Sequence, residues 1–200
     1  MEAMELTELA KPPVAALPLA GFRAQLRLGS GFASDGVQDG LLEACLRAGM
    51  AAVERRTGRV LLARDFSLAV TGWAAPARQP LPLAPVRAVN GVDLVDAQGQ
   101  TVAADGWWLR ADDQAPALEA RGVALPAIPA GGRAVIRFRA GLAESWAALP
   151  DDLARAVMML AAHYYDHRGA LGEGAMPRPL PEGVAALLAP WRRLSLGGGR

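Results

Sequence analysis

Two histidines are the residues of this chain whose spacing most suggests chemistry. His163 and His167 are the only histidines, and a separation of four places both imidazoles on one face of a helix, where they could hold a metal ion. In a zinc peptidase helix a catalytic glutamate follows the first histidine, whereas here Tyr164 follows it. No motif supplies a third ligand, and imidazoles near the C-terminal end of a helix also suit the helix dipole. We therefore expect no metal, and a small metal-dependent hydrolase using His163 and His167 is the alternative function.

The other features that could support catalysis are incomplete. A Ser-His-Asp triad would have to use one of the same two histidines, and no G-x-S-x-G motif occurs. Cys45 is the only cysteine, so it cannot form an internal disulfide, and its place on an apolar helix stripe indicates a core residue. The glycine clusters contain neither of the common phosphate-binding motifs. The sequence thus predicts no catalytic residue, no cofactor and a protein that is not an enzyme.

Three arginines alternate along one predicted strand. Arg133, Arg137 and Arg139 share one face, whereas Ala134 and Phe138 lie on the other. Three interpretations are open for this basic face: simple solvation, ion pairs between subunits, or contact with DNA passing through a ring. A DNA-binding module that uses this strand is a further alternative function, which the formal net charge of +1 disfavours.

The composition excludes several classes of protein. Of the 200 residues, 52% are hydrophobic and 20% are charged, a balance too apolar for a disordered chain. The first residues lack the basic start and apolar core of a signal sequence. No uncharged stretch approaches the roughly 20 residues of a membrane-spanning helix. We expect a protein of a reducing cytosol with no membrane partner.

The periodicity predicts an α+β fold: a small helical bundle of about four helices with an inserted, mostly antiparallel β-sheet. Helices are expected at 19–27, from Ser34 or Asp35 to Thr57-Gly58, at 150–168 and beyond Pro181. Residues 112–132 contain three prolines and are expected to form a long loop. The expected organisation is an N-terminal arm (1–17), a main domain (18–168, with helices in 18–58 and 150–168 and the β insertion at 59–141), and a linker, C-terminal helix and tail (169–200).

The helix expected at 150–168 lacks a polar face over two turns. Every residue from Ala156 to Ala162 is apolar. Such a helix needs burial on several sides. We expect it to pack on its own domain on one side and on an adjacent subunit on the other, through Ala156, Met158, Met159 and Ala162.

A short apolar stripe follows the Gly- and Pro-rich segment 169–179. Its members are Val184, Leu187, Leu188 and Trp191. A helix this short needs a surface on which to dock, and a large aromatic beside arginines is typical of interface hot spots. The stripe is expected to bind another protein, and folding back onto its own domain is the alternative.

The order of these elements resembles that of the head-to-tail connector (adaptor) family of long-tailed phages and phage-like gene transfer agents. The resemblance spans about residues 18–194, and the order and spacing of the motifs carry it. The matching segments are Leu26-Arg27 with the helix after it, Val53 to Gly58, Leu81 to Val86, Phe138 to Gly141, and His163-Tyr164-Tyr165 through to Leu180-Pro181-Glu182-Gly183-Val184. The proline-rich excursion from Ala111 to Gly132 departs from the family pattern, so its contacts stay open.

The resemblance implies a structural protein of a virion or phage-like particle, assembled in the bacterial cytoplasm. About a dozen copies would form a ring under the portal and join the DNA-filled head to the tail. The implied partners are further copies of the chain, the portal protein, a downstream stopper or tail-terminator protein, and passing DNA bound without sequence specificity. The portal-docking residues would be Leu187, Leu188, Trp191, Arg192, Arg193 and Leu194. An infectious phage and a domesticated gene transfer agent are equally compatible with it.

Overall fold

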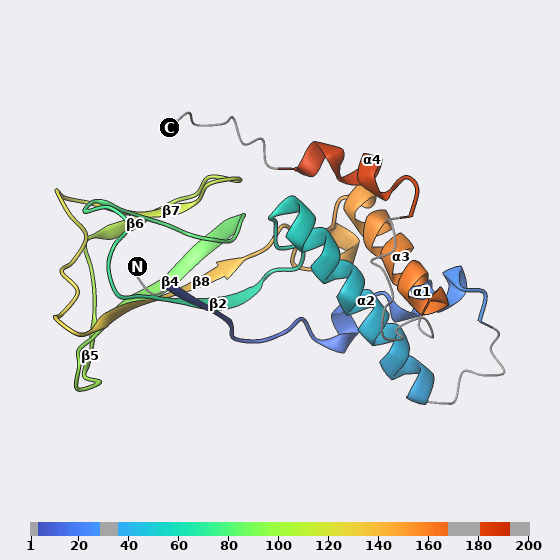
Figure 1. The fold of residues 1–200 in the computed structure, drawn as a ribbon, viewed down its shortest axis with the longest axis horizontal. Coiled ribbons are helices and arrows are strands. Elements are labelled where there is room, and N and C mark those ends of the chain that lie inside the picture. Colours follow the sequence, from blue (N-terminus) through green and yellow to red (C-terminus); the bar gives the residue numbers. More distant parts are fainter. Residues whose placement is uncertain (1–3, 29–35, 168–180, 193–200) are drawn as a thin grey trace, which may run out of the picture. The chain divides into compact units, whose positions relative to one another are not determined.

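The computed structural model describes residues 4–28, 36–167 and 181–192 of the chain. They form two compact units (Figure 1). The β unit contains the residues up to Pro12 together with Leu62–Glu144, and the helical unit contains Pro13–Leu61 and the residues from Ser145 onward. The described part holds four α-helices and two antiparallel sheets, which confirms the predicted α+β class. Within these ranges, no helix combines the length and the apolarity needed to cross a bilayer.

The larger sheet of the β unit has five strands in the described ranges, in the order β1-β2-β8-β4-β5. The strands are β1 (Met4–Glu8), β2 (Arg64–Val70), β8 (Arg133–Ala140), β4 (Val86–Val95) and β5 (Thr101–Ala103). Neighbouring strands are all antiparallel. Phe66 pairs with Phe138, and Leu68 pairs with Ile136, on one buried face. The alternation of apolar residues in these two strands therefore predicts their buried face correctly.

The smaller sheet has the strand order β3-β7-β6. It shows that the expectation of a long loop at 112–132 was wrong. Its strands are β3 (Arg78–Pro80), β7 (Ala117–Ala120) and β6 (Trp107–Arg110). The central strand β7 lies within 112–132, which the sequence predicted to be a loop. Ala117 and Leu118 are completely buried. Four residues are too few to show a period, so the strand exists because its neighbours pair with it and not because of a local pattern.

The first described residues form an edge strand. The sequence of 1–17 shows no sustained period and was expected to form an arm, yet β1 pairs with β2 from Met4 to Glu8. All five residues of β1 are exposed. Met4 and Leu6 alternate with Glu5 and Thr7, but a run of five residues is too short to predict a strand by itself.

The helical unit is built around two helices that approach closely. These are α2 (Gly36–Thr57) and α3 (Asp151–Asp166). A Cβ atom at Gly49 of α2 would lie 2.8 Å from the backbone oxygen of Val157 on α3, so only glycine allows this approach. The predicted end of α2 is confirmed: Gly58 has a φ of 67° and donates its N–H to the carbonyl of Glu54 at 2.8 Å.

Two shorter helices complete this unit. They are α1 (Leu19–Gln25) and α4 (Val184–Leu188). α1 ends two residues before the predicted end, because Arg27 has a left-handed φ of 53°. α3 ends at Asp166 instead of residue 168. The expected cap at Ser34 or Asp35 and the linker 169–179 lie outside the described residues.

Candidate functional site

The strand with three arginines has one charged and one apolar face, as predicted. Arg133 and Arg137 of β8 are exposed and Arg139 is half-buried. Ala134, Ile136 and Phe138 are completely buried. The two faces therefore have different roles: one belongs to the core of the β unit, and the other carries the positive charge.

The positive charge of this face is matched by carboxylates of the same unit. Arg137 forms an ion pair with Asp93 of β4. Arg139 Nη2 lies 2.6 Å from Glu144 Oε2, and Arg139 Nη1 lies 3.5 Å from Asp65 Oδ2. The alternation alone was compatible with pairs between subunits or contact with DNA, but Arg137 and Arg139 have acidic partners within their own chain. Arg133 is exposed at the start of the strand.

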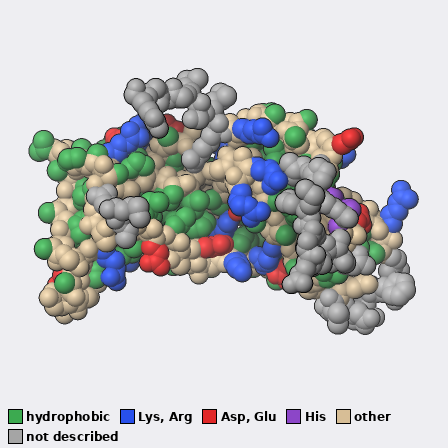
Figure 2. All heavy atoms as spheres, viewed as in Figure 1, with side chains coloured by type: hydrophobic (Ala, Val, Ile, Leu, Met, Phe, Trp, Pro, Cys, Tyr) green, Lys and Arg blue, Asp and Glu red, His purple; other side chains and the backbone are tan. Residues whose placement is uncertain are grey.

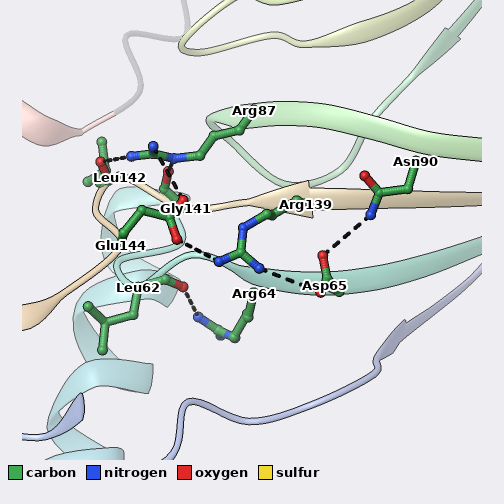
Figure 3. A network of polar contacts seen from close by, with 9 residues as sticks. All are labelled: Leu62, Arg64, Asp65, Arg87, Asn90, Arg139, Gly141, Leu142 and Glu144. Atoms are coloured by element: carbon green, nitrogen blue, oxygen red, sulfur yellow. Dashed lines mark hydrogen bonds and ion pairs between the residues drawn. The ribbon is translucent and has the colours of Figure 1, made fainter.

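A further arginine, which sequence reasoning missed, joins this polar network (Figure 3). Arg87 of β4 donates from Nε to the carbonyl of Gly141 at 2.6 Å and from Nη2 to the carbonyl of Leu142. Its Nη1 lies 3.5 Å from Glu144 Oε1. The hydrogen bond from Arg139 lowers the pKa of Glu144, and the charge of Arg87 acts in the same direction. Two arginines thus hold one carboxylate.

The network includes residues from both ends of Leu62–Glu144, the segment that makes most of the β unit (Figure 3). Ala63 donates its N–H to the carbonyl of Ala143 at 2.7 Å, so the segment's first and last residues run side by side. Gly141 has a φ of 152°, and a Cβ there would lie 2.3 Å from Cα of Ala63. These contacts hold the two ends of the segment together. The side chains of the network form ion pairs and hydrogen bonds, and they include neither a nucleophile nor an acid-base pair.

The predicted subunit-interface residues on α3 divide into two groups. Ala156 is completely buried within the helical unit, so it belongs to the core of one subunit. Met158, Met159 and Ala162 are half-buried. The apolar run is therefore partly covered by the chain's own helices, and these three residues are the part of it that an adjacent subunit could contact.

The C-terminal stripe packs on its own unit in the described structure. Leu188 is completely buried, and the indole Nε1 of Trp191 donates to Asp152 Oδ2 at 2.5 Å. Arg59 Cζ lies 5.5 Å from the centroid of the Trp191 ring, within the range of a cation–π contact. Leu187 is half-buried and Arg192 is exposed. Arg193 and Leu194 lie outside the described residues.

The two histidines contact each other near the end of α3. Their ring centroids are 4.3 Å apart, and Nδ1 of His167 lies 2.8 Å from the carbonyl oxygen of His163. Over the ranges that the structure describes, no group of three or more His, Cys, Asp or Glu residues could hold a metal ion.

Comparison with known proteins gives one consistent result. No family profile and no curated protein matches the sequence. Among solved structures, a chain from the neck of an empty gene transfer agent (GTA) particle, computed with C6 symmetry, is 48% identical. The match covers 98% of this chain and 99% of that one, with a TM-score of 0.86. A chain from the virion of a native GTA particle is also 48% identical, over 97% and 98% of the two chains, with a TM-score of 0.81. A chain from the neck of a native GTA particle, computed with C12 symmetry, is 43% identical, over 98% and 99%, with a TM-score of 0.78.

Proposed function

This chain belongs to the same family as the neck and virion chains of GTA particles, and from that membership we propose that it is the head-to-tail adaptor of such a particle. The family places the protein in a phage-like particle, with a structural role. The adaptor would join the DNA-filled head to the tail as a ring under the portal.

One observation carries this proposal. The identity of 48% to a neck chain extends over 98% of the present chain and 99% of the other, so both the helical unit and the β unit are shared. A function inferred from fold alone would be weak, because one fold serves many functions. Here the likeness includes the sequence of both units, which supports the same place in the particle.

The ring is proposed to contain about a dozen copies. The related necks were computed with C6 and C12 symmetry, and a ring of twelve subunits satisfies both. Met158, Met159 and Ala162 of α3 would then face an adjacent copy. Passing DNA would cross the ring without sequence specificity, and the flanking partners would be the portal and a downstream stopper or tail-terminator protein.

Docking to the portal is proposed for Arg192 and the two residues that follow it. Leu188 and Trp191 are engaged within their own unit, so they would support the segment instead of filling a pocket on the portal. The exposed Arg192, with Arg193 and Leu194, would make the contact. The role is that of a structural component and not of an enzyme.

Deletion of the gene in a particle-producing strain tests this function. We expect DNA-filled heads and separate tails that do not join, and expression of the intact chain should restore tailed particles. Normal tailed particles without the protein would overturn the proposal. Complementation by the His163→Ala, His167→Ala double variant should succeed for an adaptor. Failure of that variant, together with stoichiometric zinc in the purified protein, would support the hydrolase alternative.

A further inference from the structure

Both outer edges of the five-stranded sheet are open. β1 lies at one edge and β5 at the other, and within 4–28, 36–167 and 181–192 no further strand pairs with either. Every residue of both strands is exposed. An open edge presents a row of unpaired N–H and C=O groups that can bind another strand, and proteins usually cover or shorten such edges.

The outward backbone groups of β1 can be identified from its pairing. Leu9 donates its N–H to the carbonyl of Asp65 on the side of β2. In an antiparallel ladder, hydrogen-bonded and non-hydrogen-bonded pairs alternate. Thr7 and Glu5 therefore also turn their backbone groups toward β2, whereas Leu6 turns its N–H and C=O away from the sheet.

The same reasoning applies to β5. Asp96 donates to the carbonyl of Gln100 at 3.0 Å, and Ala104 donates to the carbonyl of Val92 at 2.8 Å. Val102 lies between these two pairs, opposite Leu94, and uses its backbone groups toward β4. Thr101 and Ala103 consequently turn their N–H and C=O groups outward.

The side chains at the two edges belong to one apolar row. The residues paired across the sheet in this row are Met4, Val70, Ala134, Leu94 and Val102. Val70 and Ala134 are buried in the middle, but Met4 is 58% exposed at one end and Val102 is 66% exposed at the other. Leu6, in the next row on the same face, is 40% exposed. The core of the sheet thus ends in exposed hydrophobic side chains at both edges.

Exposed hydrophobic residues concentrate in this unit. Of the seven large ones among the described residues, six belong to the β unit: Met4, Leu6, Leu9, Val102, Trp108 and Val123. Figure 2 shows hydrophobic side chains on the surface over this unit, at the left of the view. Exposed apolar surface of this kind is typical of protein that is covered in an assembly.

We propose that β1 of one copy adds to the open edge of β5 in the next copy of the ring, so that the sheets join from subunit to subunit. This inference rests on the proposed ring function. The four antiparallel pairings give β1 and β5 the same direction, so the new pair is parallel when the sheet continues. With Leu6 opposite Val102, Leu6 donates its N–H to the carbonyl of Thr101 and accepts the N–H of Ala103. The two side chains then lie on the same apolar face.

Cyclic symmetry explains why a second copy of the chain, and not another protein, would bind the open edge of β5. A closed ring requires two different, complementary patches on each subunit, because every interface joins one patch to the other. The two opposite edges of one sheet satisfy this requirement. The backbone groups are complementary in position, and pairing covers the exposed Met4, Leu6 and Val102 in one step.

A disulfide test decides this proposal in the assembled particle. A chain with Leu6→Cys and Val102→Cys should form disulfides between neighbouring subunits, because residues opposite each other in a sheet lie within disulfide range. Non-reducing gels of purified particles should show a ladder of oligomers that collapses on reduction. Each single variant should stay monomeric on the gel, since the native Cys45 is buried. As a matched control, Leu6→Cys with Val123→Cys should give no ladder, because Val123 is 96% exposed but lies on neither edge strand.

A proline pair tests the backbone hydrogen bonds separately. Leu6→Pro removes an outward N–H, so we expect an almost unchanged melting temperature and at least a tenfold loss of incorporation into particles. Thr7→Pro removes an N–H that is bonded to β2 and should lower the melting temperature. Tailed particles that contain the protein but give no ladder would overturn the edge pairing and leave the adaptor function standing. Tailed particles that lack the protein would overturn both.

Discussion

The indole nitrogen of Trp191 donates a hydrogen bond to the carboxylate of Asp152 at 2.5 Å, across 39 residues of sequence. The bond ties the last described turn to the first turn of α3, and Arg59 Cζ lies over the Trp191 ring, 5.5 Å from its centroid. The C-terminal segment is therefore part of the helical unit, although a short stripe behind a Gly- and Pro-rich segment suggested a separate docking element.

The first prediction concerns this tryptophan. Trp191→Ala should lower the free energy of unfolding by about 1 to 3 kcal/mol, less than for a fully buried tryptophan because the ring is only half-buried. Trp191→Phe keeps an aromatic ring beside Arg59 and loses the hydrogen bond, at a cost of about 1 kcal/mol. Chemical denaturation of the purified chain measures both. Unchanged stability with lost portal binding would instead make Trp191 an interface residue.

The second prediction concerns the crossing of α2 and α3. Gly49→Ala places a Cβ against the backbone of Val157 and Ala161, at 2.8 and 3.3 Å. The helices must separate, so we expect a destabilisation of about 1 to 3 kcal/mol. A Cβ at Gly40, also in α2, would have no described atom within 4 Å beyond the neighbouring backbone of its own helix. Gly40→Ala should therefore stabilise by about 0.5 to 1 kcal/mol. Equal effects in denaturation experiments would contradict the close approach.

The third prediction concerns acid stability. The hydrogen bond from Arg139 lowers the pKa of Glu144. A carboxyl whose pKa is lowered by folding stabilises the protein above its unfolded pKa, about 4.3, and this contribution is lost as the pH falls through the lowered folded pKa. Glu144→Gln should reduce stability near neutral pH and flatten its decline in acid. Thermal unfolding followed from about pH 7 to 3 checks this. The effect should be small because the side chain is 54% exposed.

Arg139→Gln supplies the control for this experiment. In that background, Glu144→Gln should alter the acid profile much less, because the main cause of the lowered pKa is gone. The same pH dependence in both backgrounds would show that Arg139 does not act on Glu144.

The fourth prediction separates folding from assembly on α3. Met158 is half-buried, so Met158→Asp should leave a folded chain but reduce its incorporation into particles several-fold. Ala156 is completely buried, so Ala156→Asp should unfold the helical unit because it buries an unpaired charge. Circular dichroism of the purified chain and immunoblots of particles give the two readouts. An equal loss of folding in both variants would make α3 a core helix with no part in the subunit interface.

Local sequence determined much of this fold. The stop of α2 at Thr57-Gly58 follows from the freedom of glycine to adopt a left-handed conformation, a property of one residue. The two faces of β8 follow from the period of two in a strand of eight residues. The order of such elements also suggested a phage-like particle protein, and the GTA particle chains found among solved structures confirm that part of the resemblance. The connector role itself stays a prediction.

Tertiary structure decided which residues meet. Nothing near Arg139 in the sequence identifies Asp65 as a partner. β1 and β7 have only five and four residues, too few to predict a strand, and they exist through pairing with distant neighbours. Ala156 and Met158 look alike in an apolar run, but packing within the helical unit buries the first completely and leaves the second half-buried. Sequence periodicity fixes the direction in which a side chain points along its own element, whereas its partner depends on packing between elements that are far apart in the chain.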